Sequence, residues 1–314
     1  MENRIIELCK SQGADIVGFA PISRFPEDSA VRKLMPEAKT VIGLLFRVLR
    51  GAYRGVEEGS TYYQYTTMGV HNMDEVVMPM AASRLSMMLE EEGYLALPQR
   101  VHHHIMAQEN ETNPEVIHDS IYRGVTQETQ LDFLETAVLC GLGEKSLHGA
   151  LLTDEFGPFV RYCFVITDLE LKPTEVVKPH LCDGCGECIK ACHGHAIDKD
   201  GKVDSWQCAT YYAGANGTKN PFMPYNAFAD FENRLEIIAG EAKVTPDTAR
   251  KILDRIIFYP PDHLFKPSIC GRACDVACYC HLEKKGVLTK KFETPFRKRE
   301  EWKFDISDFE VKGN

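Results

Sequence analysis

Long hydrophobic runs, internal repeats and low-complexity tracts are absent from this sequence of 314 residues. No apolar run approaches the ~20 residues that a membrane-spanning helix needs. The segment Met1–Cys9 is amphipathic, without the apolar centre of a signal peptide, and no twin-arginine pair stands near it. The sequence therefore predicts a cytoplasmic protein that has no membrane partner.

The composition is that of an ordinary globular protein, with 44% apolar and 26% charged residues. The length suits one large domain or two modest ones. The net charge of −10 does not favour a polyanionic partner such as a nucleic acid. Twelve cysteines are present, and thiols stay reduced in the cytoplasm. They therefore indicate metal ligands rather than a disulfide scaffold.

The pattern of apolar residues up to residue 175 predicts an α/β domain. The expected helices are Ile5–Ser11, Asp74–Gly93 and Leu131–Leu139. The expected strands are Asp15–Ala20, Thr40–Val48 and two strands within Ala150–Thr167. Residues 176–314 form the second predicted domain, which holds the cysteine groups at either end of an insertion at about 209–266. There Thr245 and Pro246 predict the start of a helix that runs to about Ile257. The basic tail Lys284–Lys303 is expected on the outside.

Four cysteines follow one another with the spacing C-x2-C-x2-C-x3-C. This spacing is typical of bacterial ferredoxins, in which three cysteines hold one [4Fe–4S] cluster and the fourth reaches a second cluster. Zinc sites also use Cys-x2-Cys pairs, but they do not need three evenly stepped cysteines and a fourth. Gly184 and Gly186 let the backbone curl around the cluster. His193 follows the run where proline is usual, which removes no ligand.

A second cluster needs four further cysteines, and the chain supplies them at 208, 270, 274 and 278. The exchange rule of two-cluster ferredoxins divides the eight into two sets. The first ligand set is Cys182, Cys185, Cys188 and Cys278, and the second ligand set is Cys192, Cys208, Cys270 and Cys274. Cys280 is an alternative to Cys278. We prefer Cys278 because its spacing from Cys274 equals the spacing of Cys192 from Cys188. Cys9, Cys140 and Cys163 are expected to be core residues.

The chain resembles the superfamily of epoxyqueuosine reductases and reductive dehalogenases over most of its length. The resemblance rests on Asp15–Gly18, Gly141–Gly149, Phe156–Arg161 with Phe164–Leu169, and the cysteine framework. It implies an α+β protein: a nitroreductase-like α/β domain that holds cobalamin, followed by a ferredoxin-like domain with two [4Fe–4S] clusters. In the glycine loop, it implies cobalamin contacts at Gly141, Gly143, Glu144, Ser146 and Gly149. Without the family context, Gly141 reads as a helix C-cap.

Substrate chemistry in this family needs a proton donor. When we count back from the glycine loop, the acidic donor of epoxyqueuosine reductases falls on Gln127, and Asp132 and Glu128 are candidate replacements. Lys145 and His148 lie in the loop itself, where the family's basic residue is replaced by Leu147. Tyr62 and Tyr63 are further candidate acids, with partly buried aromatics as the alternative interpretation.

These features favour a cytoplasmic reductase that passes electrons from a low-potential donor, such as a ferredoxin or flavodoxin, through two clusters to cobalamin. Its substrate would be a small organic molecule. One alternative is an electron carrier or reductive activator of a partner protein, without a corrin. Another is a shortened epoxyqueuosine reductase that acts on tRNA.

Overall fold

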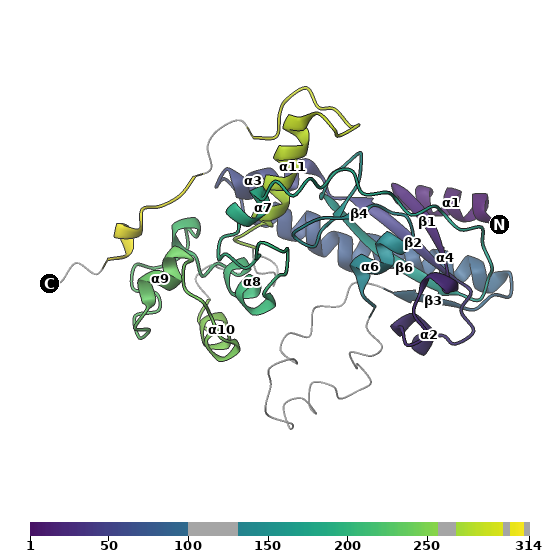
Figure 1. The fold of residues 1–314 in the computed structure, drawn as a ribbon, viewed down its shortest axis with the longest axis horizontal. Coiled ribbons are helices and arrows are strands. Elements are labelled where there is room, and N and C mark those ends of the chain that lie inside the picture. Colours follow the sequence, from purple (N-terminus) through teal and green to yellow (C-terminus); the bar gives the residue numbers. More distant parts are fainter. Residues whose placement is uncertain (100–130, 257–267, 298–301, 311–314) are drawn as a thin grey trace.

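The computed structural model describes residues 1–99, 131–256, 268–297 and 302–310. A four-stranded antiparallel sheet organises the N-terminal half (Figure 1). Its order is β1-β2-β6-β3, and the strands are β1 (Ile16–Pro21), β2 (Thr40–Arg47), β6 (Val160–Thr167) and β3 (Ala96–Gln99). The predicted strands near residues 15 and 40 are confirmed, while β3 was not predicted. Because every ladder among these described residues is antiparallel, the fold is a mixed α and β structure rather than a parallel α/β sheet.

Helices cover both faces of the sheet, which explains why β2 is an almost unbroken apolar run. Side chains alternate between the two faces of a strand. Ile42 and Leu44 join one core cluster, and Val41 and Leu45 join another. The helices of this half are α1 (Glu2–Ser11), α2 (Ala30–Leu34), α3 (Arg50–Glu57), α4 (Met78–Glu91) and α6 (Phe133–Leu139).

The expected helices in this half are confirmed, with shifted boundaries. The chain enters α4 through two π-helical stretches, Tyr65–His71 and Met73–Val77, so this helical region begins before Asp74. The helix α6 starts at Phe133 because the Asp132 side chain caps it, accepting a hydrogen bond from the Glu135 amide at 2.9 Å.

The two strands expected within Ala150–Thr167 exist, but they belong to different sheets. β5 (Leu151–Leu152) pairs with β4 (Glu144–Lys145), whereas β6 lies in the main sheet. Only an isolated bridge between Thr153 and Gly157 closes the turn between them. β6 is held instead by its ladders with β2 and β3, and this separation leaves the glycine loop beside the cysteine framework.

Short helices dominate the C-terminal half: α7 (Glu187–Lys190), α8 (Ser205–Tyr212), α9 (Arg234–Ala239), α10 (Pro246–Leu253) and α11 (Ala273–Lys285). In Figure 1, α9 and α10 lie at the end of the molecule opposite the sheet, and α7 and α11 lie between. Thr245 caps α10 as predicted, but the helix ends at Leu253, earlier than expected. The helix α11 was not predicted. Within the described ranges, every helix is too short or too polar to cross a membrane.

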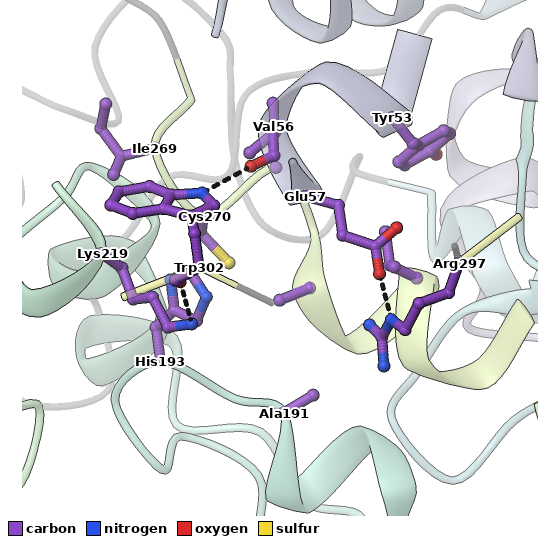
Figure 2. Close-up of a pocket in the computed structure, with 13 residues that line it drawn as sticks. Tyr53, Val56, Glu57, Ala191, His193, Lys219, Ile269, Cys270, Arg297 and Trp302 are labelled. Carbon is purple, nitrogen blue, oxygen red and sulfur yellow. Dashed lines mark hydrogen bonds and ion pairs between the residues drawn. The ribbon is translucent and has the colours of Figure 1, made fainter. Parts of the chain in front are cut away.

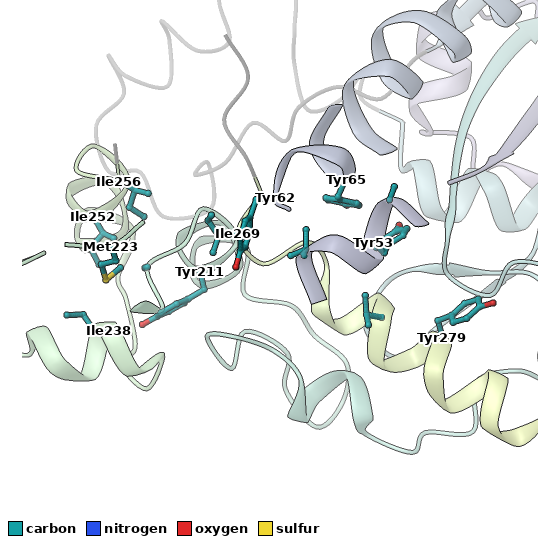
Figure 3. Packing of buried hydrophobic residues seen from close by; sticks show 14 of the residues in the cluster. Tyr53, Tyr62, Tyr65, Tyr211, Met223, Ile238, Ile252, Ile256, Ile269 and Tyr279 are labelled. Carbon is teal, nitrogen blue, oxygen red and sulfur yellow. The ribbon is translucent and has the colours of Figure 1, made fainter. Parts of the chain in front are cut away.

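One core cluster draws on both halves of the chain (Figure 3). The ring of Phe159 stacks between Tyr53 and Tyr279, at centroid distances of 3.9 and 4.3 Å. Phe296 of the tail and Phe309 beyond it are buried in this cluster, and Trp302 packs against it. Aromatic side chains thus anchor the tail, while most of its described residues are exposed. The division into domains 1–175 and 176–314 stays a prediction.

The stack around Phe159 gives a test of this packing. We expect Phe159→Ala to lower the free energy of unfolding by about 3–5 kcal/mol, because it removes a fully buried ring between two others. Urea unfolding followed by circular dichroism measures the loss. Tyr225→Ala is the control, since this ring is 66% exposed. Equal stability of both variants would contradict the packing described here.

Candidate functional site

The first three cysteines of the run lie on the loop that leads into α7 and within that helix. Gly184 and Gly186 have φ angles of +70° and +75°, a left-handed conformation that glycine adopts without steric cost. An added Cβ would meet no atom within 4 Å at either position. Backbone conformation, not crowding, therefore favours glycine here, and the loop leaves Cys185 exposed while Cys188 is buried.

All four cysteines of the first ligand set line one pocket. Cys182, Cys185 and Cys188 enter it from the α7 loop, and Cys278 enters it from α11. Burial raises the pKa of the Cys278 thiol, and the nearby thiols of the other three raise it further. The helices α7 and α11 pack directly against each other. Cys278, although distant in sequence, therefore lies where it can complete the ligand set of the ferredoxin run.

The structure favours Cys278 over Cys280 as the fourth ligand. Burial raises the pKa of Cys280 to about 12, and the charges acting on it belong to Arg297, Glu57, Glu283 and Arg50. None of these is a cysteine. The two thiols stand two residues apart on α11, so they project in different directions.

The second ligand set converges from three segments: Cys192 follows α7, Cys208 lies on α8, and Cys270 and Cys274 flank the start of α11. Burial raises the pKa of Cys270 to about 12, with further contributions from Cys208 and Cys192. Burial likewise raises the pKa of Cys274, and both Cys270 and Cys208 act on it. Two groups of four thiols match the donor set of two [4Fe–4S] clusters. The eight cysteines thus fit the clusters that the sequence predicts.

A second pocket opens beside Cys270 (Figure 2). The helix α3 forms one wall, where Glu57 makes an ion pair with Arg297 of the tail. Trp302 closes another side: its indole Nε1 donates to the Val56 carbonyl at 3.4 Å, and its own carbonyl accepts from Lys219 Nζ at 2.9 Å. The tail therefore shapes the approach to the second ligand set.

Glu144 holds the backbone of the first ligand. Its buried carboxylate accepts the amide hydrogen of His180 at 2.6 Å, of Leu181 at 3.0 Å and of Cys182 at 2.8 Å. The Leu147 amide donates to the Cys182 sulfur at 3.3 Å. The glycine loop therefore supports a cluster ligand directly.

His148 links the same loop to α11. Its Nε2 lies 2.9 Å from a carboxylate oxygen of Asp275, and its Nδ1 lies 3.1 Å from the Ser146 hydroxyl. Arg272 donates two hydrogen bonds to Asp275, at 2.8 and 3.0 Å. The side chains of His148 and Asp275 are 1% and 5% exposed, so this ion network is enclosed by protein. The backbone of Arg272 adopts a left-handed conformation, with φ of +59°.

The residues expected to hold cobalamin contact the protein's own chain. A Cβ on Gly141 would lie 2.4 Å from the Glu175 carbonyl oxygen, and one on Gly143 would lie 2.3 Å from that of Leu152. The Ser146 hydroxyl accepts from the Ala150 amide at 2.9 Å, and Glu144 is engaged as described above. Gly149, with φ of +76°, has open space around it. Of these five residues, Gly149 is the one with open space around it, and their role as cobalamin contacts stays a prediction.

The candidate proton donors have separate environments. Tyr62 is buried against Phe222 and Trp302, and burial raises its pKa. Tyr63 is partly buried, Lys145 and Asp132 are exposed, and His148 faces Asp275. Gln127 and Glu128 lie outside the described residues. The catalytic roles of these residues stay predictions.

Sequence reasoning missed a buried polar group that joins β6 to the π-helical segment before α4. Arg161 of β6 forms an ion pair with Asp74, and its charge acts on Tyr65 and Tyr53. Burial raises the pKa of Tyr53 and Tyr65, so both phenols stay protonated, and Arg272 influences both. The Phe156–Arg161 motif contained one signal, the arginine, but the tyrosines are far from it in sequence.

The Glu144 contacts lead to a test. In Glu144→Gln the side chain presents an amide donor where three backbone donors converge, so we expect a loss of about 1–3 kcal/mol in the free energy of unfolding. The measurement is chemical unfolding of the reconstituted protein. Glu135→Gln, at an exposed position on α6, serves as the control. Unchanged stability in Glu144→Gln would show that the carboxylate does not hold this segment.

No family model matches the chain, but several curated proteins do. A tetrachloroethene reductive dehalogenase of Desulfitobacterium hafniense is 44% identical over 143 residues, which are 37% of this chain and 26% of that protein. The epoxyqueuosine reductase of Bacillus cereus is 27% identical over 95 residues, 30% of this chain and 24% of that protein. The chain thus spans about a quarter of the length of these curated relatives.

Solved structures of both kinds of protein also resemble the chain. An epoxyqueuosine reductase from Bacillus subtilis has a TM-score of 0.46 at 14% identity, covering 91% of this chain and 82% of that one. A catabolic reductive dehalogenase has a TM-score of 0.47 at 18% identity, covering 80% and 35%. The named relatives are all reductases. The sequence matches confirm the predicted resemblance: this chain is similar in part to reductive dehalogenases and to epoxyqueuosine reductases.

Proposed function

We propose that this chain is an iron–sulfur oxidoreductase that carries electrons one at a time through two [4Fe–4S] clusters. The first cluster would be bound by the first ligand set and the second cluster by the second ligand set. The single observation that carries this proposal is the convergence of eight cysteines in two groups of four. A helix that serves both groups brings the clusters close enough for rapid electron transfer between them.

The direction of electron flow follows from exposure. Cys185 is the exposed member of the first ligand set, so the first cluster is the candidate entry point for electrons from a ferredoxin or flavodoxin. Cys270 of the second ligand set shares a pocket with buried Tyr53, which makes this set the candidate exit. A bound cobalamin would supply a cobalt centre for reducing a small organic substrate. This acceptor, and the nitroreductase-like and ferredoxin-like domains, rest on the resemblance.

An electron carrier without a corrin is the second candidate. It is favoured by the glycine loop, whose Glu144, Ser146 and His148 side chains are engaged within the protein. A tRNA substrate is not favoured by the net charge of −10. The presence of epoxyqueuosine reductases among the relatives nevertheless makes tRNA a necessary competitor in substrate assays.

Paired cysteine variants on α11 test the ligand assignment. We expect Cys278→Ala to lose the iron and sulfide of one cluster after anaerobic reconstitution, because its thiolate completes the first ligand set. Cys280→Ala should retain the wild-type iron content, since its neighbours are Arg297 and Glu57. Iron and sulfide analysis of the two variants decides between them. The reverse result would move the ligand to Cys280, and full iron in both would refute the first ligand set.

Cobalamin titration separates the two candidate functions. If the chain is a corrin enzyme, the reconstituted protein should bind cobalamin under anaerobic conditions and show a base-off Co(II) signal by EPR. Titration of the apoprotein provides the control for loose corrin binding. Intact cluster signals without cobalamin binding would instead establish the electron carrier.

A further inference from the structure

A buried carboxylate lies between the two ligand sets on α11. Asp275 follows Cys274 of the second set and precedes Cys278 of the first set by less than one helical turn. An Asp275 oxygen, the Cys274 sulfur and a His148 ring nitrogen all lie within 4.8 Å of one another. The carboxylate therefore adjoins a ligand of the second cluster and stands one turn from a ligand of the first.

The charge of Asp275 is held in place from two sides. His148 Nε2 lies 2.9 Å from Oδ1, and Arg272 donates from its Nε and one terminal nitrogen at 2.8 and 3.0 Å. This two-pronged contact with the always-charged guanidinium keeps Asp275 as a carboxylate, although its side chain is only 5% exposed.

This negative charge reaches both ligand sets. Its carboxylate lies within 4.8 Å of the Cys274 sulfur of the second set, and Cys278 of the first set follows three residues later on the same helix. A fixed negative charge this close disfavours an added electron on a cluster bound to these thiols. Nearby charge and hydrogen bonds to sulfur are the main protein controls on cluster reduction potential.

We propose that Asp275, positioned by His148 and Arg272, lowers the reduction potentials of both [4Fe–4S] clusters together. This inference rests on the proposed two-cluster function. Asp275 and Arg272 act here as a pair of opposed charges: the carboxylate lowers the potentials, and the guanidinium bonded to it raises them. Arg272 stands between Cys270 and Cys274 of the second ligand set in the sequence. The glycine loop takes part through His148, which holds Asp275 in place. The loop's role is therefore to position the residues around the clusters.

The experiment is an EPR-monitored redox titration of reconstituted variants. Asp275→Asn keeps the shape of the side chain and removes its charge, so both cluster potentials should become less negative. Arg272→Gln keeps a hydrogen-bond donor and removes the cation, so the potentials should become more negative, most of all for the second cluster. Opposite shifts from two neighbouring residues are not expected from a purely structural role.

The matched control is Asp15→Asn. Asp15 is also a carboxylate paired with an arginine, and its side chain is only 11% exposed, but its partner is Arg47 at the end of β2 and it belongs to neither ligand set. Its cluster potentials should equal those of the wild type. Iron, sulfide and cubane signals are measured first in every protein, and their absence from the wild type would refute the proposed function itself.

Two outcomes would overturn the inference while leaving the proposed function intact. The first is that both clusters are present in Asp275→Asn and Arg272→Gln, with potentials equal to those of the wild type. The second is that Asp15→Asn shifts the potentials as much as Asp275→Asn does. If Asp275→Asn fails to assemble clusters, Arg272→Gln alone decides, because Arg272 is 36% exposed and its replacement leaves Asp275 its His148 contact.

Discussion

The pitch of one helix is the constraint on which the site depends. Because α11 repeats every 3.6 residues, Cys274 and Cys278 lie on one side of it, about 6 Å apart along the axis. Each belongs to a different ligand set, so the helix fixes the separation of the two clusters. The α7 loop, α8 and the segment before α11 then need only bring the other six thiols to either end of this turn. A residue inserted between 274 and 278 would rotate one thiol away from its set.

A buried polar framework keeps α11 in register with the first half of the chain. Glu144 fixes the backbone at Cys182, and His148, from the same loop, fixes Asp275. Both contacts are enclosed, so each polar group would be costly to leave without a partner. The aromatic stack of Tyr53, Phe159 and Tyr279 adds an apolar tie between α3, the segment before β6 and α11. The sheet thus supports the cysteine framework through both polar and apolar contacts.

Sequence reasoning captured the features set by local rules. The buried strand β2, the capped start of α10 and the spacing of the ferredoxin run each follow from residues close together in the chain. The glycine loop shows the limit: its motif indicated a cofactor contact, but Glu144 and His148 turn towards residues 36 and 127 positions away. Such partners are decided by tertiary packing. The short β5 and the helix α11 were likewise beyond local patterns, since β5 depends on its pairing with β4.

The most direct test of the account is the EPR spectrum of the fully reduced, reconstituted protein. If α11 serves both ligand sets, each chain holds two reduced [4Fe–4S] clusters whose spins interact, and the spectrum shows splitting beyond the sum of two isolated signals. Cys192→Ala, which removes a thiol from the second ligand set, should leave the simple spectrum of the first cluster. A single cluster in the unaltered chain, or two clusters without magnetic interaction, would contradict the shared helix.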